Sequence, residues 1–317
     1  MQEILLAVIS PVVFAGAVRI AAPLVIGSVG GCFTEKSGTF VLAYECFMLI
    51  SAFFATWGSY VTGSAVLGAL IAVMVSILVG ILFGILVFRF QANGMIVSIA
   101  LIYGAWAVTT LLLVSIFQVR GSFISPDIIS FQTISIPFLN QVPVLNDVLN
   151  NKIGPVYLAF LLTGAAYVVM YKTPFGLRLR GVGMNATAAQ TAGTNIRRYK
   201  WTALIIMCAC CGLGGAIIPL SGVSMFTENM TSGRGFLCLA AVLVGGGNPI
   251  KTSIVAFLFA YTDALYLTLT SFGLPTQLLS CIPYVAVIFV LIVSKLRARR
   301  KAALGAGGLK WRKKVTA

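Results

Sequence analysis

Long apolar runs separated by short polar segments dominate the chain. Because a transmembrane helix needs about 20 apolar residues, this pattern predicts an all-α, polytopic membrane protein of about nine transmembrane helices, within a range of about eight to ten. The first run contains Pro11, Arg19 and Pro23, which favours two shorter pieces there. The expected spans are about 4–28, 40–62, 64–88, 93–117, 154–171, 201–222, 235–249, 252–272 and 276–294.

The span at 235–249 is shorter than the others and ends in Gly245-Gly246-Gly247-Asn248-Pro249. Glycine and proline at this point predict a broken or half-length helix. Lipid tolerates such a helix only where protein or a cavity shelters the freed backbone groups.

The composition agrees with a membrane protein and narrows the class. Of the 317 residues, 59% are hydrophobic and only 9% are charged, and the mean hydropathy is +1.02. A soluble globular protein carries roughly 25% charged residues. These values exclude a soluble domain, a disordered chain and a nucleic-acid-binding protein, so no nucleic acid is expected as a partner.

The charge is uneven: 22 Lys+Arg against 7 Asp+Glu, a formal net charge of +15. Most of the basic residues lie in 172–200 and 295–317, which contain no acid. By the positive-inside rule both are cytoplasmic, whereas the balanced segments 118–153 and 223–234 lie outside, as does the N-terminus. The chain is therefore read as one membrane domain, 1–294, followed by a basic cytoplasmic tail that anionic membrane lipids attract.

The chain lacks histidine, which removes histidine-ligated metal sites and histidine-dependent nucleophiles. Cys208 and Cys211 form a lone C-x-x-C inside an expected span, where small buried side chains explain it better than zinc. Neither a metal nor another cofactor is expected.

Three charged residues, Arg19, Glu45 and Asp263, lie well inside apolar segments. An ionisable group in the membrane usually faces a cavity, a partner charge or a substrate. Glu45 and Asp263 are candidates for lining a substrate pathway, and a structural ion pair is the alternative. No nucleophile or metal cluster accompanies the two carboxylates, so the chain is not expected to be an enzyme.

The run Gly246 to Thr252 resembles a phosphate-binding loop, but Ile250 replaces the glycine that precedes the lysine of that motif. Pro249 also removes a backbone donor from the loop. The run is therefore not expected to bind ATP, and any use of ATP requires a partner that hydrolyses it.

Segment 172–200 contains a short, alanine-rich helix. Asn185 is a good N-cap and Gly193 a good C-terminal stop. The small side chains let another protein's groove approach the backbone closely. An interfacial loop held by lipid phosphates is the alternative, which explains the charge but not the capped helix. The residues expected to carry the contact are Asn185, Ala186, Ala188, Ala189, Gln190 and Gly193.

Taken together, these stretches resemble the integral-membrane permeases of ATP-binding-cassette (ABC) importers, in the branched-chain amino acid, ribose and nucleoside group. The likeness is greatest to the simple-sugar and nucleoside permeases, and it covers roughly residues 20–270. The matching stretches are Thr34-Glu35-Lys36-Ser37-Gly38, Glu45 with Met48-Leu49, Thr173 through Arg180, Thr191-Ala192-Gly193, Glu228-Asn229-Met230-Thr231-Ser232-Gly233-Arg234-Gly235-Phe236 and Asn248-Pro249.

The resemblance implies a function and a set of partners. By it, 184–193 is a coupling helix that sits in a cleft of a cytoplasmic ABC ATPase. It further implies a second permease subunit, in a heterodimer, an extracytoplasmic substrate-binding lipoprotein and a location in the bacterial cytoplasmic membrane. The 228–236 stretch is expected near the translocation pathway, with Asn229 and Arg234 as candidate substrate contacts.

The stretch around Glu45 departs from the family pattern. The family usually reads Asn-Ile-Gly-x-Glu-Gly, whereas this chain has Val41-Leu42-Ala43-Tyr44-Glu45-Cys46. Only the acid is retained, which leaves the substrate open among nucleoside, purine base and simple sugar. The alternatives to a nucleoside permease are a ribose- or galactose-like sugar permease and a secondary transporter with Glu45 or Asp263 as its proton or cation site.

Overall fold

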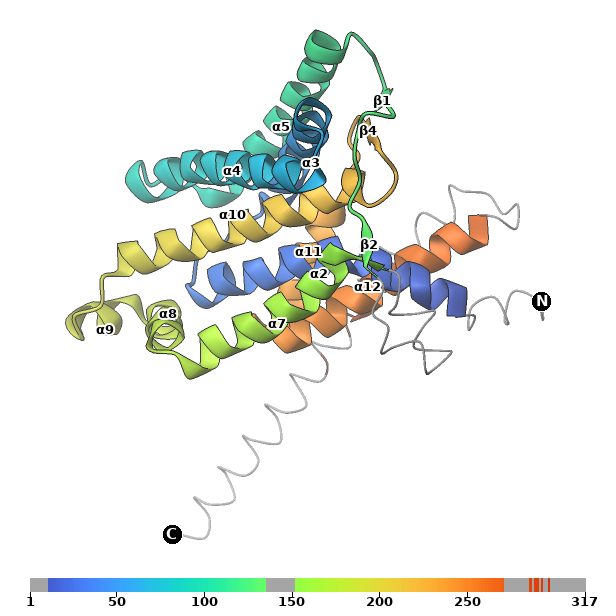
Figure 1. The fold of residues 1–317 in the computed structure, drawn as a ribbon. Helices are drawn as coiled ribbons and strands as arrows, with labels where there is room; N and C mark the ends of the chain where they lie inside the picture. Colours follow the sequence, from blue (N-terminus) through green and yellow to red (C-terminus); the bar gives the residue numbers. More distant parts are fainter. Residues whose placement is uncertain are drawn as a thin grey trace, which may run out of the picture.

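The computed structural model describes residues 11–134 and 152–270, with scattered helical positions between 285 and 296. Six helices in this part of the chain are long and apolar enough to cross a membrane (Figure 1). They are α2 (Pro11–Lys36), α4 (Ala65–Gly84) with the π-helical turn η1 (Ile85–Arg89), α5 (Gly94–Phe117), α7 (Gly154–Lys172), α10 (Ile196–Leu220) and α12 (Pro249–Thr270). The structure confirms a mostly helical, polytopic membrane protein.

Two further helices complete the bundle: α3 (Tyr44–Thr62), most of whose side chains are buried, and the short α11 (Arg234–Gly245). The short span expected at 235–249 is therefore a 12-residue helix. The span expected at 276–294 falls mostly outside the described residues, and the count of about nine stays a prediction.

Helix α2 corrects one expectation, because it runs unbroken from Pro11 to Lys36 with Pro23 inside it. The reason is its position at the centre of the molecule, where α10 and α12 pack along it. Neighbouring helices shelter the backbone groups that an internal proline frees, so the helix continues. Because α2 is central, it also makes close contacts with other helices.

The core forms where α2, α3 and α10 meet. At Gly215 of α10, an added Cβ atom would lie only 2.8 Å from the Met48 Cα atom of α3. Glycine is required at this point because the two backbones touch. By contrast, α4 and α5 leave most of their apolar side chains exposed or half-buried at the periphery, as expected of helices that face lipid.

The two ends of the bundle carry different structural elements. At one end lie the short helices α8 (Pro174–Met184) and α9 (Ala186–Thr191), on the left of Figure 1. At the other, β1 (Ser122–Ile124) pairs antiparallel with β4 (Met225–Thr227), and β2 (Thr133–Ile134) with β3 (Lys152–Ile153). The segments that the charge pattern assigns to opposite sides of the membrane thus occupy opposite ends.

Candidate functional site

The N-terminus of α11 lies inside the bundle, against the first turn of α3. Glu45 of α3 is only 4% exposed, and its carboxylate accepts three hydrogen bonds from the segment that begins α11. The Gly233 N–H donates to Oε1 at 2.9 Å, the Gly235 N–H donates to Oε2 at 2.7 Å, and the Thr231 hydroxyl also donates to Oε1. A carboxylate at a helix N-terminus satisfies donors that lack partners within the helix.

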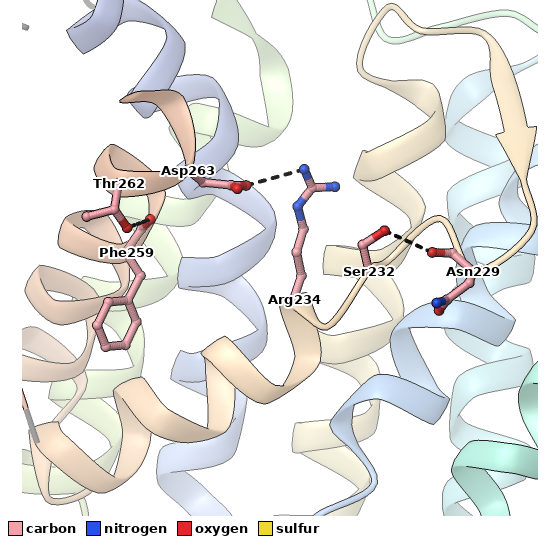
Figure 2. Close-up of polar contacts among 6 residues, drawn as sticks. All are labelled: Asn229, Ser232, Arg234, Phe259, Thr262 and Asp263. Atoms are coloured by element: carbon pink, nitrogen blue, oxygen red, sulfur yellow. Dashed lines mark hydrogen bonds and ion pairs between the residues drawn. The ribbon is translucent and has the colours of Figure 1, made fainter. Parts of the chain in front are cut away.

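The loop before α11 has an unusual backbone. Asn229 and Ser232 adopt positive φ angles of 53° and 45°, and Gly233 follows at 84°. The loop is also tied to itself, because the Ser232 hydroxyl donates to the Asn229 carbonyl at 3.1 Å (Figure 2). The result is a tight turn that delivers the chain from β4 into α11.

Arg234, the first residue of α11, forms an ion pair with Asp263 of α12. The Nη2 atom lies 3.4 Å from Oδ2, and the two side chains are 25% and 15% exposed. Figure 2 shows the guanidinium extending from the start of α11 toward the carboxylate. No other salt bridge occurs among the residues that the structure describes. The two candidates singled out from sequence, Arg234 and Asp263, therefore lie together.

A cavity of about 490 Å³ opens beside this pair, between α2, α10, the loop after α10 and the start of α11. Arg234 lines it together with Arg19, and Ser221 and Thr227 are polar residues on its wall. The remaining walls are mostly aliphatic. An apolar cavity with a few convergent polar groups is the usual form of a small-molecule site.

Arg19 is the residue that sequence reasoning undervalued. Its guanidinium lines the cavity and donates to the Ser221 carbonyl, which is 202 positions away in the chain. Intramembrane charges usually face cavities, which made Arg19 a candidate. Its position between Pro11 and Pro23 instead favoured a break in the helix at this point. The second cationic group at the cavity is therefore a finding of the structure.

The other sequence candidates occupy different places. Glu45 and Asn229 are not among the residues that line the cavity. Asn229 is exposed on its turn, while Glu45 is buried beneath the start of α11. Asp263 does not line the cavity either, but it forms an ion pair with Arg234, which does. The geometry thus brings Arg234 and Asp263 together and leaves Asn229 apart.

The short helix in segment 172–200 has the expected caps. The Ala188 N–H donates to Asn185 Oδ1 at 3.1 Å, and Gly193 ends the turn with a φ of 77°. The predicted contact residues are exposed or half-buried, at the opposite end from β1 and β4.

The end of α8 touches the end of α2. A Cβ atom added at Gly183 would overlap the Lys36 carbonyl and lie 3.0 Å from the Gly38 nitrogen. Gly247, just after α11, meets the same place, because a Cβ there would lie 3.1 Å from the Glu35 and Lys36 side chains. We call this meeting point of Lys36, Gly38, Gly183 and Gly247 the helix-end junction.

The glycine-rich run after α11 serves to connect two helices. Gly246 and Gly247 adopt positive φ angles, and the Asn248 side chain accepts from the Ile250 N–H at 3.1 Å at the start of α12. Among the described residues, no group of three or more acidic or cysteine side chains is placed to hold a metal ion.

Comparison with known proteins gives a consistent result. The family model described as "Branched-chain amino acid transport system / permease component" matches residues 13–291. The chain is 29% identical to a nucleoside ABC transporter permease of Lactococcus lactis, over 86% of this chain and 88% of that one. It is 30% identical to a guanosine ABC transporter permease of Bacillus subtilis, over 77% and 78%.

A third relative has a different printed substrate. A glucose ABC transporter permease of Haloferax volcanii is 25% identical, over 90% of this chain and 77% of that one. No solved structure matches the chain.

Proposed function

The chain belongs to the permease component family of branched-chain amino acid transport systems, and on that premise we propose that it forms half of the translocation pathway of an ATP-driven nucleoside importer. As an integral-membrane permease subunit it is not itself an enzyme. The cavity at Arg234 is the observation that supports the substrate assignment. Its aliphatic walls suit the faces of a nucleobase, and its two guanidinium groups can donate to base and ribose acceptors.

The relatives also support the nucleoside assignment, since permeases named for nucleosides and guanosine are similar along most of both chains. The glucose permease relative makes a simple sugar the second candidate. A sugar carries hydroxyl groups around its whole ring, and the mostly aliphatic cavity offers few partners for them.

The proposal includes separate partners. A cytoplasmic ABC ATPase would receive the α9 segment, and a second permease subunit would supply the other half of the pathway. An extracytoplasmic lipoprotein would deliver the substrate. Two lines of support are the exposed, capped α9 and the fact that both Bacillus subtilis and Lactococcus lactis have two different permeases similar to this chain.

The decisive experiment is reconstitution. The chain is purified with its co-expressed ATPase and second permease, placed in liposomes, and supplied with labelled guanosine, labelled glucose and the binding protein. We expect ATP-dependent uptake of guanosine that unlabelled nucleosides inhibit. Uptake of glucose alone would establish the sugar permease, and uptake by this chain alone under a pH or sodium gradient would establish a secondary transporter.

We also propose the topology of about nine spans with the N-terminus outside. Single cysteines at Arg120 and Thr187, each introduced in turn, test the sides of the membrane that it assigns to 118–153 and 172–200, with a membrane-impermeant maleimide. Reagent added to intact cells is expected to label Arg120→Cys, whereas Thr187→Cys requires permeabilised cells. Labelling of both in intact cells would contradict the assignment. The six native cysteines in the described part of the chain are buried or half-buried, which limits background.

Bulky side chains on α9 are expected to uncouple ATP hydrolysis from transport. Replacing Ala188 and Ala189 with phenylalanine enlarges a surface that we propose sits in the ATPase cleft. Uptake should fall at least roughly tenfold, because close packing tolerates little added volume, while the chain still inserts in the membrane. Leu177→Phe, at a 65% exposed site on α8, is the control. Normal uptake by the double variant would remove α9 from the coupling interface.

A further inference from the structure

The buried carboxylate of Glu45 accepts its hydrogen bonds from one short segment of the chain. Its three hydrogen bonds come from Thr231, Gly233 and Gly235, and they use both carboxylate oxygens. Glu45 lies outside the cavity lining, although it is an intramembrane acid. Its surroundings therefore fit a structural anchor for α11 better than a direct contact with a transported molecule.

The anchored segment needs an external restraint. Asn229 and Ser232 have positive φ angles that side-chain-bearing residues rarely adopt, so the turn holds its shape only if its surroundings fix it. The Glu45 bonds to Gly233 and Gly235 lie directly after the second of these residues. The carboxylate also faces the N-terminus of α11, where the helix dipole favours a negative charge.

The packing at Gly235 brings the segment into direct contact with Glu45. A Cβ atom at Gly235 would lie 2.5 Å from the Glu45 Cα atom and 2.7 Å from its Oε2 atom. Glycine at position 235 thus lets the first turn of α11 rest directly on the first turn of α3. Contact and hydrogen bonds together determine where α11 begins.

Arg234 lies between the two glycines whose N–H groups Glu45 holds. We propose that Glu45 is a positioning residue: it fixes the start of α11 so that the Arg234 guanidinium lies in the cavity and pairs with Asp263. This inference rests on the proposed function, in which that cavity takes the substrate. Glu45 acts on the substrate only through Arg234.

The test is a double-mutant cycle in the reconstituted importer. In Glu45→Gln an NH₂ group replaces one acceptor and must face a backbone donor, so α11 loses part of its anchor. We expect the KM for guanosine to rise about tenfold, with a smaller change in the maximal rate. Glu45→Asp keeps the charge and is expected to fall between the wild type and Glu45→Gln.

The same cycle shows whether the effect passes through Arg234. If it does, Glu45→Gln combined with Arg234→Gln raises KM no further than Arg234→Gln alone. Multiplicative effects in the double variant would overturn the inference. The control is Glu228→Gln, the same chemical change at the outer end of the same loop, where the carboxylate accepts from the Gly121 N–H at 3.0 Å.

The outcomes separate the two proposals. If Arg234→Gln leaves uptake unchanged, the cavity assignment is wrong and the proposed function fails at this site. If Arg234→Gln raises KM while Glu45→Gln does not, the cavity stands and only the positioning role of Glu45 is wrong. Membrane insertion and co-purification with the ATPase are measured for every variant, and Glu45→Asp provides a carboxylate-retaining comparison if Glu45→Gln does not assemble.

Discussion

Arg234→Gln is expected to raise the KM for nucleoside uptake by roughly 10- to 100-fold. The change removes the cavity's guanidinium at the start of α11 and leaves Asp263 without its ion-pair partner. Hydrogen bonds to charged groups contribute about 1.5–3 kcal/mol, and each 1.4 kcal/mol corresponds to about a tenfold change in affinity. The measurement is the initial rate of ATP-dependent uptake in liposomes over a range of guanosine concentrations.

Asp263 allows the loss of charge balance to be separated from the loss of the substrate contact. In the double variant Arg234→Gln with Asp263→Asn, position 263 no longer carries a carboxylate without its ion-pair partner, so assembly should recover toward the wild-type level. Uptake should stay low, because the guanidinium is still absent. Recovery of uptake in the double variant would show that Arg234 only balances Asp263 and does not contact the substrate.

Arg234→Lys and Arg120→Gln complete the comparison. Lysine keeps the positive charge but loses the planar, multi-donor geometry of the guanidinium, so an intermediate KM is expected. Arg120 lies exposed before β1, outside the cavity lining, and Arg120→Gln should transport at the wild-type rate. A similar loss of uptake in Arg234→Gln and Arg120→Gln would point to a general effect of basic charge on the protein.

The helices were predictable because their signals are local. Hydropathy placed the run at 93–117, and α5 spans Gly94–Phe117 because the Asn93 side chain caps its start by accepting from the Met95 N–H. The same local logic failed at α2. Proline at 23 breaks an isolated helix, but neighbouring helices in the folded bundle support the backbone around it.

The candidate site was only partly predictable, because its contacts are not local. Arg234 and Asp263 were each selected from sequence, yet nothing in their spacing indicated that they pair. Arg19 donates to the backbone carbonyl of Ser221, which is 202 positions away in the chain. Glu45 shows the limit most clearly: the sequence marked it as an important acid, but only the fold reveals that its partners are the Thr231 hydroxyl and the backbone N–H groups of Gly233 and Gly235.

Gly183→Ala is expected to uncouple the importer more severely than its small size suggests. The new methyl group would overlap the Lys36 carbonyl at the helix-end junction, so α8 must move away from the end of α2. Lys36 ends the helix that carries Arg19, and Gly247 follows the helix that carries Arg234. A displacement at the junction therefore reaches both cationic helices of the cavity. We expect uptake to fall at least roughly tenfold, with ATPase binding retained.

Gly181→Ala is the matched control on the same helix. A Cβ atom at Gly181 meets no other atom within 4 Å, whereas one at Gly183 meets the α2 backbone. Both changes replace glycine with alanine in α8, so both gain up to about 1 kcal/mol of helix propensity. Only Gly183→Ala disturbs the junction. Equal uptake by the two variants would mean that α8 transmits no movement to α2, and the link from α9 to the cavity would have to follow α10 instead.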